Sequence, residues 1–124
     1  MIHLDKEENS AFFKKSIHYL QATGFENIKA DIVGCEKPKS YLQTRSGVNI
    51  TPDIVAIKNG RKYFFDISLK SEERGLLKSK WLFLDALCRK RSNYFRIITT
   101  KGHYKFTENM LDDINLGALL TIKI

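Results

Sequence analysis

The dipeptide Asn59-Gly60 lies between two runs of β-forming residues, 54–57 and 63–67. Asn-Gly favours a two-residue type I′ turn, because both central residues of that turn need a positive φ. The two runs are therefore predicted to form a β-hairpin. With Lys58 opposite Arg61, the numbers of opposed residues on the two strands sum to 119.

This register places two carboxylates opposite each other. Asp53 pairs with Asp66 at a non-hydrogen-bonded position, so their Cβ atoms are expected about 4.5–5.5 Å apart. Such a like-charged pair is unfavourable unless both groups reach solvent, one is protonated, or a cation lies between them. The pair is predicted either to bind a divalent cation such as Mg²⁺ or to consist of two exposed acids near strand ends.

The rest of the pattern predicts an α/β protein. Apolar spacing indicates helices at about 7–23, 76–90 and 109–115, and further strands at 28–33, 94–99 and 118–124. The polar stretch 34–49 is predicted to be a loop. The resulting order, α-β-β-β-α-β-α-β, implies a small mixed β-sheet with flanking helices.

Length and composition predict a single domain, residues 1–124, without a membrane segment. The N-terminus is acidic where a signal peptide would be apolar, so a cytoplasmic location is expected. Cys35 and Cys88 have neither metal-ligand spacing nor a disulfide pattern, and they are interpreted as small buried hydrophobic residues.

Positive charge is concentrated in the second half of the chain. The formal net charge is +7, and residues 58–105 hold thirteen basic and four acidic side chains. A basic field of this kind suits a polyanion such as nucleic acid, whereas the alternative is a solvated surface. The candidate nucleic-acid contacts are Lys78, Arg89, Lys90, Arg91 and Lys101.

The central motifs resemble a known family. The run Thr51–Val55 with its Pro-Asp pair, the hairpin, the run Phe65–Lys70 and a long helix are similar to the core of the PD-(D/E)xK nucleases. The preceding segment Tyr19–Phe25 resembles the end of the first helix in several members. The resemblance spans about residues 8–100 and implies a restriction-endonuclease-like core.

The resemblance further implies a Mg²⁺-dependent nuclease. In that family the two acids, here Asp53 and Asp66, hold Mg²⁺, and a lysine positions or activates the attacking water. A divalent ion stabilises charge on the scissile phosphate and lowers the pKa of bound water.

The family triplet is split in this chain. Asp66-Ile67-Ser68 keeps the acid but has serine in place of lysine, whereas Ser68-Leu69-Lys70 keeps the lysine but loses the acid. Lys70 is four residues, about 13 Å, along the strand from Asp66. Lys78 and Lys80 on the following helix are the alternatives, so the candidate catalytic residues are Asp53, Asp66, Lys70 and Lys80. The helix-borne glutamate of the family has no clear counterpart, since Phe13 aligns there and Glu8 is more than a turn away.

Two other functions compete with the nuclease. An inactive nuclease-like domain would bind DNA or RNA through lysine and arginine. A protein-interaction module is suggested by aromatic residues that look exposed, such as Tyr41 and Tyr104. Trp81 is expected in the core rather than as a base-stacking platform, and His103 as a loop residue rather than a general base. A homodimer is compatible with each alternative.

Overall fold

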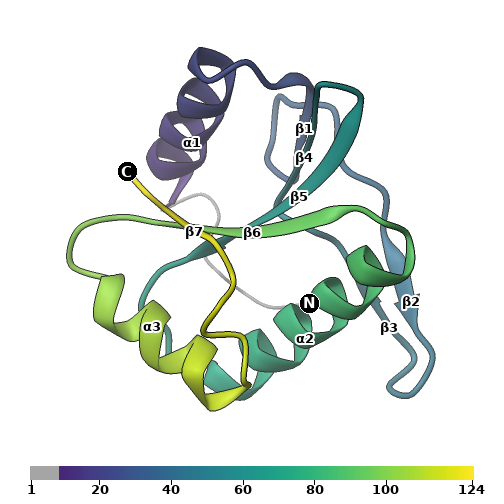
Figure 1. Cartoon of the computed structure of the whole chain (residues 1–124), viewed down its shortest axis with the longest axis vertical. Helices are drawn as coiled ribbons and strands as arrows, with labels where there is room; N and C mark the ends of the chain where they lie inside the picture. Colours follow the sequence, from purple (N-terminus) through teal and green to yellow (C-terminus); the bar gives the residue numbers. More distant parts are fainter. Residues whose placement is uncertain (1–8) are drawn as a thin grey trace.

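A mixed five-stranded sheet with the order β1-β4-β5-β6-β7 forms the centre of the computed structural model, which describes residues 9–124 (Figure 1). Its strands are β1 Glu26–Ala30, β4 Ile54–Lys58, β5 Arg61–Ser68, β6 Tyr94–Thr99 and β7 Thr121–Lys123. β1, β4 and β5 are antiparallel neighbours, whereas β5, β6 and β7 run parallel. The predicted α/β class with a mixed sheet is confirmed.

Helices cover both faces of this sheet. In the described residues they are α1 Ser10–Ala22, α2 Arg74–Lys90 and α3 Tyr104–Asp113. α1 lies on one face, and α2 and α3 lie on the other (Figure 1). Within residues 9–124, no helix is both long enough and apolar enough to cross a membrane.

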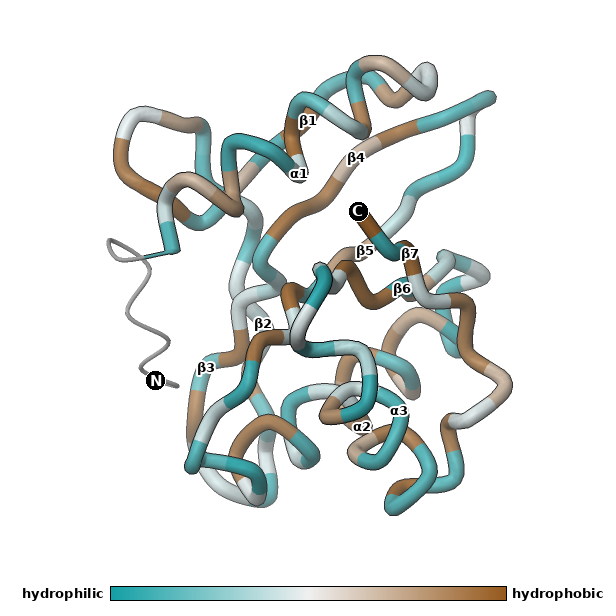
Figure 2. The backbone as a smooth tube through the Cα atoms, turned by 90° about the vertical axis from the view of Figure 1, so that its left-hand side faces the viewer, coloured by the Kyte–Doolittle hydropathy of each residue, from teal (hydrophilic) through white to brown (hydrophobic). Residues whose placement is uncertain are grey.

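The β4–β5 hairpin has the predicted turn and register. Asn59 and Gly60 have φ values of 53° and 73°, as a type I′ turn requires. Lys58 pairs with Arg61, and Ile54 pairs with Phe65. Figure 2 shows that the middle of the sheet is mostly hydrophobic and that the turn is hydrophilic.

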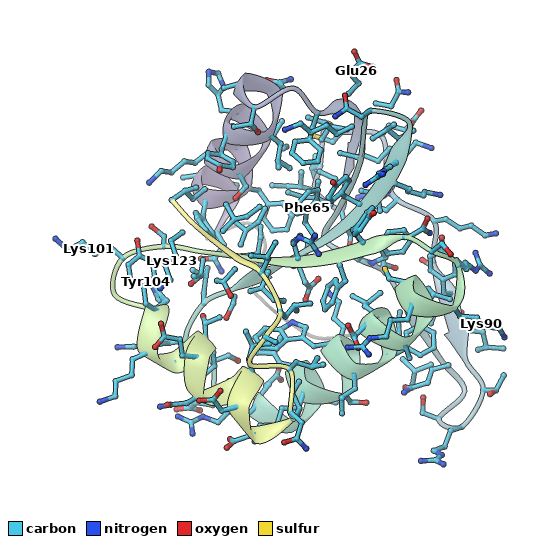
Figure 3. All side chains as sticks on the ribbon, in the orientation of Figure 1. Glu26, Phe65, Lys90, Lys101, Tyr104 and Lys123 are labelled. Atoms are coloured by element: carbon cyan, nitrogen blue, oxygen red, sulfur yellow. The ribbon has the colours of Figure 1, made fainter. Side chains whose placement is uncertain are left out.

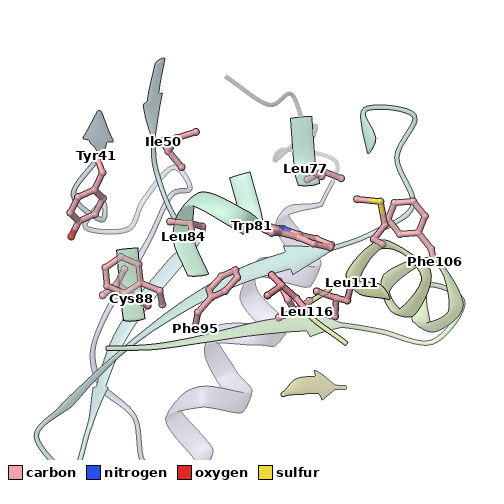
Figure 4. Close-up of a cluster of buried hydrophobic side chains, with 14 residues drawn as sticks. Tyr41, Ile50, Leu77, Trp81, Leu84, Cys88, Phe95, Phe106, Leu111 and Leu116 are labelled. Atoms are coloured by element: carbon pink, nitrogen blue, oxygen red, sulfur yellow. The ribbon is translucent and has the colours of Figure 1, made fainter. Parts of the chain in front are cut away.

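The side chains of β5 alternate between two hydrophobic clusters. Phe65 and Ile67 pack on the side of α1, together with Phe13 and Leu20. Phe64 packs on the other side, in the cluster that includes Leu77, Trp81, Leu84 and Cys88 of α2 (Figure 4). Asp66 shares the face of Phe64, because alternate residues of a strand point to the same side.

The predicted loop at 34–49 is wrong in its second half. β2, Tyr41–Gln43, and β3, Val48–Ile50, form a separate antiparallel hairpin between β1 and β4. Strands of three residues are too short to give a periodic signal. Tyr41 is only 9% exposed and its ring centre lies 5.8 Å from that of Phe64, so the prediction of an exposed Tyr41 is also wrong.

The remaining differences are in the ends of elements. α3 begins at Tyr104 rather than near 109, because Gly102 ends the preceding loop and the helix starts at once. β1 covers 26–30 instead of 28–33, with a bulge between Glu26 and Lys29. β7 is shorter than expected. The predicted start of the first helix at residue 7, and Glu8, lie outside the described residues.

Candidate functional site

Asp53 and Asp66 meet where the β4–β5 hairpin ends, on the face covered by α2. The backbone N–H of Asp53 donates to Asp66 Oδ1 at 3.2 Å, and the backbone N–H of Ile67 donates to Asp53 Oδ2 at 2.9 Å. Both residues are 0% exposed. The alternative of two solvent-exposed acids is therefore wrong, because α2 and the sheet enclose them.

Lys80 of α2 supplies a cation between these carboxylates. Its Nζ lies 3.2 Å from Asp53 Oδ1 and 2.8 Å from Asp66 Oδ1. The side chain of Lys80 is 7% exposed. A cation between two opposed acids stabilises the pair, and here that cation is the ammonium group of Lys80. We call Asp53, Asp66 and Lys80 the acid–lysine cluster.

Trp81 is both a core residue and a partner of the acid–lysine cluster. Its ring is fully buried among apolar side chains of the α2 face (Figure 4). Its indole Nε1–H donates to Asp66 Oδ2 at 2.9 Å. The expectation of a core residue is confirmed, and the hydrogen bond adds a role in orienting the carboxylate, since a buried indole N–H needs an acceptor.

The environment shifts the protonation of the cluster. Burial, followed by the neighbouring Asp53 carboxylate, raises the pKa of Asp66 to about 7, although Lys80 opposes the shift. Burial by itself would lower the pKa of Lys80, but the attraction of Asp53 and Asp66 outweighs it and holds that pKa above its ordinary value. Near neutral pH, Asp66 is therefore partly protonated, while Lys80 stays charged.

The donor set of the cluster fits Mg²⁺ in type and number. Mg²⁺ commonly takes one or two protein carboxylates, with water and phosphate oxygens completing its shell. Asp53 and Asp66 are the residues that would hold it. Within residues 9–124, no three His, Cys, Asp or Glu side chains are grouped closely enough to bind a metal ion without such outside ligands. An ion held by both carboxylates competes with the Lys80 ammonium for them.

Ser68, at the lysine position of the split triplet, contacts α3. It is fully buried, and its Oγ is 2.7 Å from Thr107 Oγ1 of α3. Thr107 Oγ1 in turn donates to the carbonyl of His103 at 2.9 Å. Packing of α3 against the end of β5 therefore fills the space beside Ser68 with a hydroxyl network.

Lys70 is not brought to the acids. Among the described residues, no hydrogen bond or ion pair joins its ammonium group to Asp53 or Asp66. Its backbone N–H donates to His103 Nδ1 at 2.9 Å, so Lys70 lies beside the β6–α3 loop. Partial burial, followed by the charge of Lys70, lowers the pKa of His103.

The predicted nucleic-acid contacts are dispersed. Lys78 forms an ion pair with Asp113 at 3.0 Å, and Arg89 forms one with Asp85 at 2.9 Å. Figure 3 shows Lys90 and Lys101 on opposite sides of the molecule. The guanidinium of Arg91 lies 5.2 Å from the ring centre of Tyr41. These residues do not form one continuous face.

A different basic group was missed in the sequence. Arg96 lies over the rings of Tyr63 and Tyr94, at 5.7 and 5.3 Å from their centres. Arg61 donates to the Tyr94 hydroxyl at 2.9 Å. The sequence does carry a signal for this group, because an arginine and a tyrosine lie two positions apart on β5 and again on β6. This group lies on the sheet face opposite Asp66.

Neither a family model, nor a curated protein, nor a solved structure gives a significant match to this chain. Its function is therefore inferred from geometry. The most distinctive geometry is the acid–lysine cluster, in which residues 53, 66 and 80 are buried together.

Proposed function

We propose that the chain is a nuclease-like protein that hydrolyses phosphodiester bonds with Mg²⁺ held by Asp53 and Asp66. The position of Lys80 carries this proposal. Its Nζ is within 3.2 Å of both carboxylates. The two-acid and lysine combination that the sequence splits between two triplets is thereby reunited in space, with the lysine supplied by α2.

The order of elements supports a restriction-endonuclease-like core. α1 precedes three antiparallel strands, β1, β4 and β5, and α2 then leads to β6, which is parallel to β5. This is the α-β-β-β-α-β order of the PD-(D/E)xK resemblance, with the β2–β3 hairpin added between β1 and β4. Asp53 directly precedes β4 and Asp66 lies within β5, which agrees with the positions that the resemblance implies for the two acids.

The residues of the cluster have separable roles. Bound Mg²⁺ would stabilise charge on the scissile phosphate and lower the pKa of a water molecule. Lys80 places a permanent positive charge beside the acids, where low local polarity strengthens its effect. The N–H groups of Ile67 and Trp81 hold the carboxylates in orientation. Asp66 must lose its proton to act as an anionic ligand, so activity should rise as the pH passes through about 7.

A second candidate is a nuclease-like protein without catalysis that binds nucleic acid. One observation favours it: Lys80, Trp81 and backbone N–H groups already contact the carboxylate oxygens of both acids in a fully buried setting. The cluster is then neutralised by the protein alone. Binding would depend on surface lysine and arginine and would weaken steeply with added salt.

The two candidates differ in a cleavage experiment. End-labelled single-stranded, duplex and branched oligonucleotides are incubated with the protein in Mg²⁺ or in EDTA, together with Asp53→Asn and the matched surface variant Lys78→Met. The nuclease predicts Mg²⁺-dependent cleavage that Asp53→Asn slows by about 100-fold or more and that Lys78→Met keeps. Cleavage that is equal in Asp53→Asn rejects the proposal. Salt-sensitive binding without cleavage favours the second candidate.

A further inference from the structure

A pocket of about 310 Å³ opens beside Lys80, between α2 and the β2–β3 hairpin. α2 contributes Leu76, Ser79 and Lys80 to its wall. The hairpin contributes five residues: Gln43, Ser46, Val48, Asn49 and Ile50. Figure 1 shows the hairpin alongside α2, at one side of the molecule. Lys80 belongs to both, so the pocket adjoins the acid–lysine cluster, although neither acid lines it.

The hairpin is anchored firmly enough to shape this pocket. Tyr41 and Ile50, which pair across β2 and β3, are both buried in the cluster under α2. Val48 remains partly exposed and lines the pocket. One part of the hairpin therefore packs into the core, while another part forms a wall of the opening.

The chemistry of the lining suits an uncharged group that has both apolar surface and hydrogen-bonding atoms. Val48, Ile50 and Leu76 provide apolar surface, and Gln43 and Asn49 provide side-chain amides. Gln43 Oε1 accepts a hydrogen bond from Ser46 Oγ at 2.8 Å, which orients that amide. Apolar walls with a few placed polar groups are typical of small-molecule sites, and a volume near 300 Å³ is at their lower limit.

The charges at the pocket disfavour an anion in it. Asp31 lines the pocket, and its carboxylate forms an ion pair with Lys37 at 3.7 Å. The positive charge of Lys80 is already shared by two carboxylates. A phosphate would therefore meet no unopposed cation there, whereas a nucleobase carries no charge and offers hydrogen-bonding edges.

We propose that this pocket receives one unpaired nucleobase next to the scissile phosphate, so that the substrate is single-stranded or contains an unpaired nucleotide. The inference rests on the proposed nuclease function and names its substrate class. A base in a duplex must first leave the stack and its pair, which requires a few kcal/mol. Single strands should therefore be cleaved faster than duplexes of the same sequence.

The test uses a large side chain, introduced at an exposed position of α2, to fill the pocket. Ser79→Trp adds an indole to its wall, and Ala86→Trp adds the same group to an exposed position two turns later on α2, as a control. The wild type is expected to cleave a single strand about tenfold or more faster than the duplex. Ser79→Trp should remove most of that difference by slowing single-strand cleavage, and Ala86→Trp should leave it unchanged. Equal rates on both substrates, or an unaltered Ser79→Trp enzyme, would overturn the inference.

Nucleoside binding separates this inference from the proposed function, because it needs neither Mg²⁺ nor cleavage. Thymidine and deoxyadenosine are titrated into the full chain, and amide chemical shifts are followed by NMR. Saturable shifts in the β2–β3 hairpin and the first turns of α2, absent from Ser79→Trp, support the pocket even if no substrate is cut. Absence of such shifts in the wild type rejects it even if cleavage is observed.

Discussion

The two faces of the central sheet are built on different principles. The α1 face is closed by apolar side chains such as Phe13, Leu20 and Phe65. Its buried polar side chain Ser16 is satisfied within α1, by the carbonyl of Phe12. The α2 face has a similar apolar cluster but also encloses the acid–lysine cluster.

Under the proposed function, the α1 face is organised for stability and the α2 face for chemistry. Removing two carboxylates and an ammonium group from water is expensive, and well-packed apolar residues often replace buried ion pairs without loss of stability. The α1 face shows that this chain can close a sheet without burying charged side chains. Under the proposed function, the buried charges of the α2 face serve chemistry, and variants on the two faces test that contrast.

The largest expected effect comes from removing the cation of the α2 face. Lys80→Met leaves two buried carboxylates without their ammonium partner, so the free energy of unfolding should fall by about 3–5 kcal/mol. Urea denaturation followed by circular dichroism measures it. Lys78→Met, which breaks a more exposed ion pair with Asp113, should lower it by less than about 1 kcal/mol. Similar losses in both variants would mean that burial does not distinguish the two lysines.

The next prediction is that a cavity on the α1 face lowers stability but leaves the cleavage rate unchanged. Leu20 is fully buried, so Leu20→Ala should lower the free energy of unfolding by about 2–5 kcal/mol through lost packing. Cleavage per folded molecule, measured well below the unfolding transition, should stay at the wild-type rate. A rate reduced as strongly as in Asp53→Asn would show that the two faces are not independent.

A smaller effect is expected from the indole hydrogen bond. Trp81→Phe keeps an aromatic ring but removes the donor to Asp66 Oδ2. The free energy of unfolding should fall by about 1–3 kcal/mol. The carboxylate loses a hydrogen bond to its charged form, so the pKa of Asp66 should rise further. Carboxyl chemical shifts followed against pH by NMR test this, and an unchanged or lower pKa would contradict it.

The last effect is a pH slope, which is small for each pH unit. The pKa of Asp66 is about 7 in the folded protein against an ordinary value of 3.8, so the folded state binds this proton more tightly. The resulting stabilisation is complete below the ordinary pKa and is lost as the pH rises through about 7, with a slope of at most about 1.4 kcal/mol per pH unit. Asp66→Asn should remove that slope, measured by denaturation at a series of pH values. An equal slope in the variant would assign it to other groups.

The sequence predicts the elements whose signals are local. The Asn59-Gly60 turn sets the register of β4 and β5, and that register brings Asp53 to Asp66. The apolar stripe of α2 predicts that Trp81 is buried. The bounds of β6, Tyr94–Thr99, are predicted correctly, because a short apolar run ends at a glycine-containing loop.

What the sequence leaves open depends on contacts between distant segments. Lys80 could equally have belonged to the solvated side of its helix, and only the packing of α2 on the sheet directs its ammonium group to the acids. The hairpin at 41–50 has strands of three residues, whose stability comes from burying Tyr41 and Ile50 in a cluster formed by other elements. Neither fact follows from periodicity in a single segment.

The central claim is that the acid–lysine cluster is present for phosphodiester hydrolysis rather than for stability. The most direct measurement uses the neutral triple variant Asp53→Asn/Asp66→Asn/Lys80→Gln, which keeps the size of the two acids and one amide oxygen each to accept from the N–H groups of Ile67 and Trp81. Its unfolding free energy and its Mg²⁺-dependent cleavage are measured beside those of the wild type. We expect a stability within about 2 kcal/mol of the wild type, or higher, with cleavage abolished. Cleavage at the wild-type rate by this variant would contradict the account.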